Sequence, residues 1–481
     1  MFTPKSVKLE LVADEKIFRI LDGQSKICNW LYNCLLEHAN RAKEEFCKTQ
    51  NPELSKTVYS KRGLRNLIPD LKKECPFLKS VYSAPLKNAA LRLSASIQAH
   101  QKGKKGQRKG KSGWPSFRSW QTRWFSLLYD EPQKGYKVTG NALTLSLGVD
   151  SKGKRLSVSL RLKGASCLQG LLIRNLRLTY TAGTYYAIFA VEVPLPAKKS
   201  IRRVIALDPN HKNFVYGVDT NGNAIEVASP RFCKLQSKRI DELKSQRDRC
   251  LKKSKKVVVN DINGQPLGKE YFIPSRRWKH FNSSLERALH QRQEQTKTYA
   301  YTLAHKLCRD YDCVGIGNYT PHGDQKFRTF NRSMFNNSLI GRFKIILSWV
   351  AAKSGKTYVE YDEKGTTRTC HNCGYIFESG LAPNIRKWRC PQCEIEHIRD
   401  ENSAQNGLRL VLRDLSQKEG MNVPVVPGSG LVRVSERWAW RVLPSGVETL
   451  RGGKNSVQTQ RQEIKTESMV AFDQKLVTCQ L

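Results

Sequence analysis

Hydrophobic and polar residues follow two different spacings in the first hundred residues. Residues 6–12 alternate between apolar and polar side chains, the two-residue period of a β-strand with one buried face. From Ile17 to Cys47 apolar residues recur every three or four positions, and residues 54–100 continue this spacing with turn signals between segments. That is the period of amphipathic helices. The pattern predicts a helical domain over residues 16–109, inserted after a single strand.

Several runs of strand length lie between residues 121 and 194, with Gly or Asn turns between them. They are ALTLSLGV, RLSVSLRL, LLIRNLRLTY and YYAIFAVEV. Short successive strands favour an antiparallel β-barrel, and the strand at 6–12 is expected to join it. We therefore predict a barrel over residues 1–15 and 110–200, which ends in the linker-like sequence PLPAKKS.

Strands and long helices alternate after residue 201. Strands are predicted at 202–208, across a hairpin that turns at 221–223, at 313–318 and at 357–362, and helices at 233–256, 285–311 and 338–353. This alternation predicts an α/β domain with a mixed sheet opened by a hairpin. The fold class of the whole chain is therefore multidomain α+β.

The last part of the sequence loses this periodicity. After about Val411 the chain is irregular and rich in Gly, Ser and Gln. Residues 412–481 are therefore predicted to be mostly disordered, because they cannot bury enough apolar surface to offset the entropy of ordering. Trp438 and Trp440 leave room for a short docked segment within this tail.

The charge of the chain indicates a polyanionic partner. Lys and Arg number 83 against 42 Asp and Glu, which gives a net charge of +41. Such a charge binds phosphate backbones by counterion release. A basic surface without chemistry, as in a ribosome-like protein, is the alternative. No apolar run approaches the roughly 18 residues that span a bilayer, so no membrane partner is expected.

The N-terminus has no apolar signal core, so the protein is expected to stay inside the cell. In a bacterium it would be cytoplasmic and associated with the nucleoid, and in a eukaryote it would be nuclear.

Two basic segments are candidates for nucleic-acid binding. In residues 100–120 Lys and Arg alternate with Gly, which is typical of a solvated linker, but nearby aromatics such as Trp114 and Trp124 offer bases a stacking surface. The helix at 233–256 carries basic residues on several faces, which suits a helix between nucleic-acid strands. The candidate residues are Lys104, Lys105, Arg108, Lys109, Lys111, Arg118, Lys234, Lys238, Arg239, Arg247, Arg249 and, before the first paired cysteine, Arg368.

Four of the 14 cysteines have the spacing of a metal site. Cys370 and Cys373 form one Cys-x-x-Cys pair, and Cys390 and Cys393 form a second pair after sixteen residues. This spacing predicts one tetrahedral Zn²⁺, which is structural because four thiolates fill its coordination sphere. Chance among many cysteines is the alternative, and the ten scattered cysteines are most simply small buried hydrophobes.

Two acidic residues stand where a carboxylate can hold a hard cation. Asp208 ends a strand, and ligands of open α/β sheets bind at the carboxyl ends of strands. Standing alone, it would more often be a turn-capping Asp. Asp400 lies in the first turn of a predicted helix, where the helix dipole by itself favours an acid.

These segments together resemble TnpB, the RNA-guided nuclease encoded by bacterial insertion sequences and related to the type V CRISPR effectors and the eukaryotic Fanzor proteins. ALDPN, the hairpin, the long basic helix and TTRTCHNCG…WRCPQC…HIRDENSAQN carry the resemblance over about residues 202–410. Upstream, GWPSFR at 113–118 is similar to the family's Gly-x-Pro-x-Phe-Lys/Arg stretch.

The resemblance implies a specific arrangement of domains. The N-terminal barrel would be wedge-like and interrupted by a helical recognition domain. Residues 201–369 and 394–411 would form a RuvC-like, RNase H-like nuclease domain, with a zinc ribbon inserted at 370–393.

The resemblance also implies a catalytic Asp-Glu-Asp set that holds two Mg²⁺ ions. Asp208 and Asp400 match its first and third members. Where many relatives carry the Glu, this chain has Gly317 and no carboxylate. One branch of TnpB and the Fanzor proteins carries a Glu just before Thr-Thr-Arg instead, and Glu363 matches that position.

The next strand can supply the missing acid, because neighbouring strands lie only about 4.8 Å apart. Glu360 and Asp362 are rivals, but they belong to the opposite face of the strand from Glu363. The three acids therefore cannot all point at the same metal ions.

The expected function is RNA-guided DNA endonuclease activity by two-metal hydrolysis, with guide RNA and double-stranded target DNA as partners. A nuclease-inactive, RNA-guided DNA-binding repressor is the alternative, motivated by the missing acid at Gly317. A guide-free, structure-specific nuclease is a third candidate, although it has little need of the large N-terminal half. The target-adjacent motif and the oligomeric state stay open.

Overall fold

The computed structural model describes most of the chain in two compact units, which divide between Pro194 and Leu195. The described residues are 2–108, 110, 112–119, 123–198, 200–210, 213–260, 266–319, 339–381, 385–419, 438–443 and 446–451. Among them, no helix is both long enough and apolar enough to cross a membrane. The division between the units falls at the start of the predicted linker.

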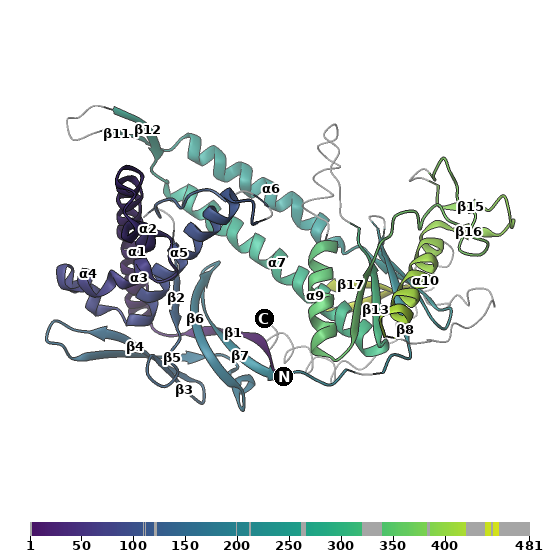
Figure 1. Ribbon diagram of the computed structural model, residues 1–481, viewed down its shortest axis with the longest axis horizontal. Coiled ribbons are helices and arrows are strands. Elements are labelled where there is room, and N and C mark those ends of the chain that lie inside the picture. The colour runs from purple at the N-terminus through teal and green to yellow at the C-terminus, as the bar shows by residue number, and fades with distance from the viewer. Residues whose placement is uncertain are drawn as a thin grey trace. The chain divides into compact units, whose positions relative to one another are not determined.

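The first unit contains a seven-stranded antiparallel sheet, shown curled in Figure 1. Its strands, in spatial order, are β2 (Ser126–Tyr129), β6 (Leu172–Thr181), β7 (Thr184–Pro194), β1 (Phe2–Val12), β5 (Arg155–Leu162), β4 (Ala142–Val149) and β3 (Tyr136–Thr139). β1 pairs with β7 along most of its length and with β5 at its end, so the N-terminal strand joins the sheet as predicted. The described strands leave β2 and β3 as edges, which makes this a curled sheet and not a closed barrel.

Helices follow β1 and share a core with the sheet. They are α1 (Glu15–Thr49), α2 (Pro52–Tyr59), α3 (Gly63–Asn66), α4 (Ile68–Glu74), the 3₁₀ helix η1 (Pro76–Ser80) and α5 (Ser83–Lys104), and a second 3₁₀ helix, η2 (Ala165–Leu168), follows β5. Leu21, Leu31 and Leu35 of α1 are fully buried, which is the apolar stripe that the sequence shows. These side chains belong to the same cluster as Leu127 and Phe189 of the sheet. The inserted helices and the strands therefore fold around one core.

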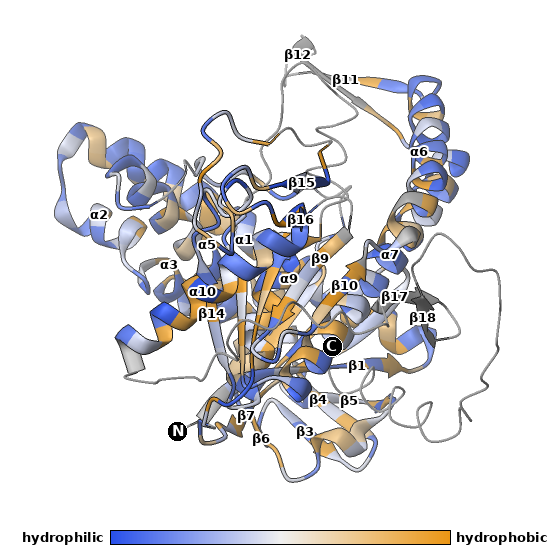
Figure 2. Cartoon of the chain, turned by 90° about the vertical axis from the view of Figure 1, so that its right-hand side faces the viewer, coloured by the Kyte–Doolittle hydropathy of each residue, from blue (hydrophilic) through white to orange (hydrophobic). Residues whose placement is uncertain are grey.

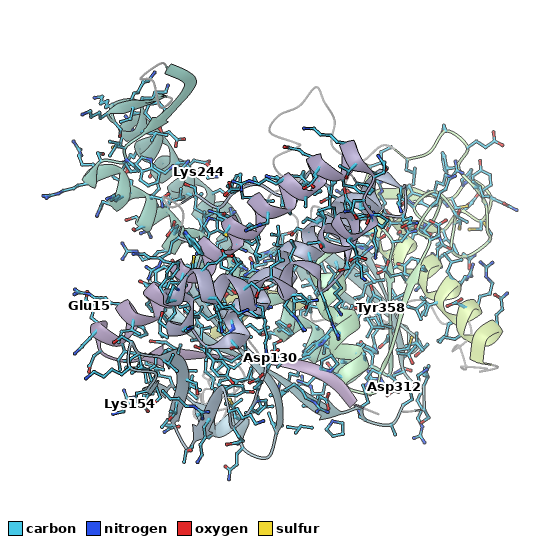
Figure 3. All side chains as sticks on the ribbon, turned by 60° about the vertical axis from the view of Figure 1, so that its left-hand side comes forward. Glu15, Asp130, Lys154, Lys244, Asp312 and Tyr358 are labelled. Atoms are coloured by element: carbon cyan, nitrogen blue, oxygen red, sulfur yellow. The ribbon has the colours of Figure 1, made fainter. Side chains whose placement is uncertain are left out.

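The second unit is built on a five-stranded mixed sheet. Its order is β10 (Ala224–Ala228), β9 (Asn213–Asp219), β8 (Val204–Pro209), β13 (Cys313–Gly317) and β14 (Thr357–Tyr361). β8, β9 and β10 pair antiparallel, whereas β13 runs parallel to both β8 and β14. This confirms the predicted mixed sheet opened by a hairpin. Just before β13, Asp312 (labelled in Figure 3) accepts hydrogen bonds from the amides of Arg202 and Arg203 and from Lys356 Nζ, the last at 2.7 Å.

Helices cover both faces of this sheet. α7 (Arg276–Asp310) and α9 (Ile340–Lys353) pack on one face, against Ile205 and Leu207 of β8. α10 (Arg399–Glu419) packs on the other, against Val204 and Ala206. Because side chains alternate along a strand, the even-numbered residues of β8 face α10. Figure 2 shows hydrophobic residues concentrated on the strands of this sheet.

Three features of the second unit differ from the sequence predictions. α6 (Arg231–Lys252) and α7 pack along each other and are joined by an unpredicted hairpin of β11 (Lys256–Asn260) and β12 (Pro266–Phe272). α10 continues to Glu419, past the predicted end at 411. β17 (Trp438–Leu443) pairs with β18 (Gly446–Arg451) and lies against β10, so part of the predicted disordered tail is a docked hairpin. The rest of 412–481 after Glu419 lies outside the described residues.

Candidate functional site: a carboxylate cluster beside a cysteine ribbon

Three acidic residues reach the same edge of the five-stranded sheet. Asp208 lies near the end of β8, Glu363 lies two residues after β14, and Asp400 is the second residue of α10. β8, β13 and β14 are parallel, so their carboxyl ends meet at this edge. Asp208 lies on the same face of β8 as Val204 and Ala206, and this face is covered by α10. The fold brings the first turn of α10 to the same place.

Glu363 occupies the space that a side chain at Gly317 would take. A Cβ added to Gly317 would overlap Glu363 Oε2 and would come within 3.2 Å of Pro209 Cδ. Gly317 pairs with Tyr361 across β13 and β14, so a residue two positions later can fold its carboxylate back over β13. The structure therefore places the carboxylate of Glu363 at the position where β13 lacks an acid.

The rival acids of the same strand have other partners. Glu360 accepts a hydrogen bond from Tyr358 Oη at 2.6 Å and lies 4.0 Å from Lys344 Nζ. Asp362 accepts a hydrogen bond from the amide of Lys364 at 3.1 Å. Neither reaches Asp208 in the contacts of the described residues, whereas Glu363 and Asp208 interact electrostatically.

Burial raises the pKa of two of the three acids, Asp208 and Glu363. Burial raises the pKa of Asp208 to about 8, although a hydrogen bond from Ser403 opposes the shift; the charges of Glu363 and Asp400 add to it. Burial also raises the pKa of Glu363 to about 7, against the opposing charge of Lys344. Both carboxyl groups would ionise more readily if a cation were bound between them.

A chain of hydroxyl groups connects Glu363 to Asp208. Thr366 Oγ1 donates to the carbonyl of Glu363 at 2.8 Å and lies 2.9 Å from Ser403 Oγ. Ser403 Oγ donates to Asp208 Oδ1 at 2.8 Å. Sequence reasoning missed both hydroxyls, although Ser403 follows Asp400 by three residues and so lies on the same face of α10. These hydrogen bonds connect the segment after β14, helix α10 and strand β8 at the carboxylate of Asp208.

Two asparagines anchor the segment that carries Glu363 to α10. Asn406 Nδ2 donates to the carbonyls of Thr366 and Thr369 at 2.9 and 2.7 Å, and Asn402 Nδ2 donates to the carbonyl of Thr369 at 2.7 Å. Asn402 Oδ1 accepts from the amide of His371 at 2.9 Å, next to the first cysteine. These contacts hold the acid, the cysteine pair and the helix in one frame.

Asp400 is paired with an arginine from the cysteine ribbon. Arg386 Nη1 donates to Asp400 Oδ1 at 3.0 Å, and the arginine side chain is 38% exposed. The carboxylate oxygens of Asp208, Glu363 and Asp400 do not all come within 4.8 Å of one another, a spacing that only the four cysteines meet in the described part of the chain. Sequence reasoning missed Arg386.

The residues of the cluster nevertheless suit a hard cation. Carboxylate oxygens are the preferred ligands of Mg²⁺, which binds through one or two carboxylates and keeps several waters. Glu363 Oε2 is buried and has no hydrogen-bond partner among the described residues. A buried polar atom without a partner is costly, and a cation would satisfy it. Mg²⁺ therefore fits this donor set.

The four paired cysteines meet as predicted. Their ligand atoms all lie within 4.8 Å of one another. The Sγ atoms of Cys370 and Cys393 are 3.7 Å apart, and those of Cys373 and Cys390 are 3.6 Å apart. A tetrahedron with metal–sulfur bonds of about 2.3 Å has edges of about 3.8 Å. The cluster can therefore hold one metal ion such as zinc.

The backbone around the cysteines has the geometry of two matching turns. Gly374 follows the first pair at φ +80°, and Glu394 follows the second at φ +56°. Glu394 takes a left-handed conformation that usually favours glycine, and Arg389 holds it through bonds to its carbonyl and carboxylate at 2.8 and 2.9 Å. His397, in β16 (Glu396–Ile398), which pairs with β15 (Lys387–Arg389), places Nε2 3.1 Å from Cys370 Sγ.

The candidate nucleic-acid-binding residues divide into several groups. At and just after the end of α5, three candidates are exposed: Lys104, Lys105 and Arg108. On α6 the exposed candidates are Lys238, Arg239 and Arg249, whereas Arg247 is half-buried beside Asp248. Before the cysteines, Arg368 is exposed. Lys109 and Lys111 lie outside the described residues, as does the side chain of Lys234. Arg118 is half-buried against α1, where its Nη1 donates to Asn29 Oδ1 at 2.7 Å.

Parts of this chain are similar to known proteins. Residues 341–406 match the family described as Cas12f1-like, TNB domain. TnpB-like proteins L79 and L770 of Acanthamoeba polyphaga mimivirus are 29% identical over 146 residues, which is 29% of this chain and 28% of each viral protein.

A solved structure of a Cas12f1–sgRNA–target DNA complex has a similar fold, with a TM-score of 0.51 at 12% identity over 84% of this chain and 98% of that chain. The domain match and the viral relatives show that part of this chain is similar to TnpB-like proteins, and the solved structure shows a similar fold.

Proposed function

We propose that this protein is an RNA-guided DNA endonuclease whose cutting site is the Asp208–Glu363–Asp400 cluster. The observation that carries the proposal is the carboxylate of Glu363, which fills the space above Gly317 beside buried Asp208. The strand order β10-β9-β8-β13-β14 suits an RNase H-like, RuvC-type domain. Base pairing with a guide RNA would supply sequence specificity, and the protein would read a short adjacent duplex motif.

Asp208, Glu363 and Asp400 would hold two Mg²⁺ ions, which supply an activated water and stabilise the leaving 3′ oxygen of the phosphodiester. The chain's own contribution is to fix the carboxylates before substrate arrives. Ser403 orients Asp208 through its hydrogen bond, and Tyr361 Oη donates to the carbonyl of Leu207 at 2.8 Å, which holds β14 against β8.

The cysteine ribbon would hold a structural Zn²⁺ that positions Asp400. Four thiolates leave no open coordination position, which excludes a catalytic role for this ion. His397 beside Cys370 would orient and stabilise a ligand sulfur. The ribbon leads directly into α10, so its folding sets the first turn that presents Asp400.

The basic residues of α6 would bind the phosphates of guide RNA or of the RNA–DNA hybrid. Lys238, Arg239 and Arg249 are exposed on this helix, as is Lys244, which is labelled in Figure 3. Each phosphate contact would contribute to a strong salt dependence of binding.

The test is guided cleavage by the purified ribonucleoprotein on a target plasmid with a randomised flank. We expect Asp208→Asn, Glu363→Gln and Asp400→Asn to abolish cutting and to keep target binding. Glu360→Gln is the matched control, because this acid lies on the same strand and already pairs with Tyr358. Cutting by Glu363→Gln at the wild-type rate would show that the acid lies elsewhere.

A guided DNA-binding repressor is the second candidate. Two observations favour it: β13 ends in Gly317 without a carboxylate, and Arg386 neutralises Asp400. For such a protein, wild type and Glu363→Gln would hold the target equally and neither would cut it in any divalent metal.

A further inference from the structure

Lys344 of α9 is a buried cation next to the candidate site. The chain carries 83 Lys and Arg residues, and among the side chains that the structure describes Lys344 is the one of these that is buried, at 9% exposure. Lysine normally keeps its ammonium group in water, because a charge that leaves water loses its hydration. The position of Lys344 therefore needs groups that compensate its charge.

The packing of α9 fixes the place from which this side chain starts. Phe343 is fully buried, and its ring centroid lies 5.2 Å from that of Phe214 of β9 in an edge-on arrangement. Leu347, one turn further along α9, is fully buried as well. Tyr319, just after β13, packs against the same apolar cluster. Lys344 therefore extends from a firmly packed helix beside the end of β13.

The hydrogen bonds of this region lead from Lys344 to Glu363. Lys344 Nζ donates to the carbonyl of Tyr319 at 3.2 Å. The backbone amide of Tyr319 in turn donates to the carboxylate of Glu363. Tyr319 is held in place because the amide of the preceding residue, Asn318, donates to the carbonyl of Tyr361 at 2.9 Å. One residue therefore accepts a hydrogen bond from Lys344 and donates one to the candidate acid.

The charge of Lys344 acts on two acids, which differ in their contact with water. Glu360 Oε2 lies 4.0 Å from Lys344 Nζ, but the Glu360 side chain is 47% exposed. It also accepts a hydrogen bond from Tyr358, which is labelled in Figure 3. Water screens such a pair, so it contributes little. Glu363 is the other acid, and its Oε2 is buried, so the charge of Lys344 has its larger effect there.

We propose that Lys344 is a positioning residue of the candidate site, which holds the carboxylate of Glu363 over Gly317 through Tyr319 and through its own charge. Glu363 stands two residues beyond the end of β14, where the ladder of the sheet no longer fixes it. Lys344 would not touch substrate and would act through Glu363. This inference deepens the proposed nuclease function and rests on it for the identity of the site.

The first test is single-turnover cleavage by the ribonucleoprotein of Lys344→Met, which keeps an apolar side chain of similar length and removes the charge and the donor. We expect unchanged target affinity and cutting that is about 10²-fold slower, the loss that a misplacement of about 1 Å produces. Lys344→Arg keeps the charge and the donors and should restore most of the rate. Glu360→Gln is the control and should cut like wild type. Wild-type cutting by Lys344→Met overturns the proposal.

The second test is a double-mutant cycle that does not depend on cutting. The melting temperature of the metal-free, full-length protein is measured at pH 8.5, above the pKa of about 7 of Glu363. Loss of the cation leaves the buried carboxylate uncompensated, whereas a neutral amide needs no cation. Lys344→Met should therefore lower the melting temperature by at least about 2 °C more in the wild-type background than in the Glu363→Gln background.

The cycle has a substitute variant and a clear contrary result. Lys344→Gln also removes the charge but keeps a polar group that can donate to the carbonyl of Tyr319, so it takes the place of Lys344→Met if that variant does not fold. Equal losses of melting temperature in the two backgrounds mean that Lys344 does not act on Glu363, and they overturn the proposal.

The two tests separate this inference from the proposed function. A protein that shows the coupling between Lys344 and Glu363 but never cuts retains the positioning residue and loses the nuclease. A protein that cuts its target but shows no coupling retains the nuclease and loses the role of Lys344.

Discussion

Gly317→Ala is the sharpest perturbation of the proposed site, because it adds one methyl group where Glu363 places its carboxylate. The new Cβ would overlap Glu363 Oε2 and would stand 3.3 Å from Glu363 Cβ and 3.2 Å from Pro209 Cδ. The carboxylate must move by at least about 1 Å to restore van der Waals contact. Displacement on that scale costs about 10²-fold in rate at a catalytic centre.

The same methyl group has a smaller effect on stability. Overpacking a well-filled site typically costs about 1–3 kcal/mol. At about 2–4 °C of melting temperature per kcal/mol for a domain of this size, the variant should melt several degrees lower and stay folded at 25 °C. The loss of rate should therefore exceed what unfolding explains.

The assay is single-turnover cleavage by the ribonucleoprotein, with target binding and thermal melting measured on the same samples. Gly341→Ala is the matched control, because a Cβ at Gly341 of α9 meets nothing within 4 Å. We expect Gly317→Ala to bind the target normally and to cut about 10²-fold more slowly. Wild-type cutting by Gly317→Ala would refute the reasoning that Glu363 works from the space above Gly317.

Other perturbations have equally specific outcomes. Ser403→Ala should raise the pKa of Asp208 further and move the acidic limb of the pH–rate profile to higher pH. Ser403→Thr should return that limb to its wild-type position. Burial raises the pKa of Asp208 from 3.8 to about 8, so the metal-free protein should lose stability as pH rises over that window, and the melting shift caused by Mg²⁺ should grow with pH between 6 and 8.5. Cys390→Ser should release zinc and lower the melting temperature of the second unit, read by a zinc-sensitive dye and calorimetry. Arg386→Ala should tighten Mn²⁺ binding, because it frees Asp400; weaker binding would contradict a competitive ion pair.

Local sequence patterns anticipated the order of elements well. Alternating residues at 6–12, the strand that ends in Asp208 and the amphipathic α1 all appear as predicted, because burial of one face enforces the spacing. The four cysteines meet for a similar reason, since two pairs at a fixed spacing can close on one metal.

Other features depend on contacts that no local pattern contains. Arg118, a candidate for nucleic-acid binding, donates to Asn29 and stacks on Tyr32 of α1, and no local pattern contains these contacts. The hairpin β11–β12 and the docked β17 were not anticipated as strands, since short strands take their stability from pairing partners and not from their own sequence.

The choice among the acids of the candidate site shows most clearly what the sequence determines and what the tertiary structure determines. The sequence alone determined that β13 ends without a carboxylate and that three acids, Glu360, Asp362 and Glu363, lie in or just after the next strand. Strand parity already divided them between two faces. Only the tertiary structure decided that Glu363 fills the space at Gly317, because that depends on the register between β13 and β14. Register is set by pairing between Gly317 and Tyr361, which are far apart in the sequence, and by the packing of α10 on both strands.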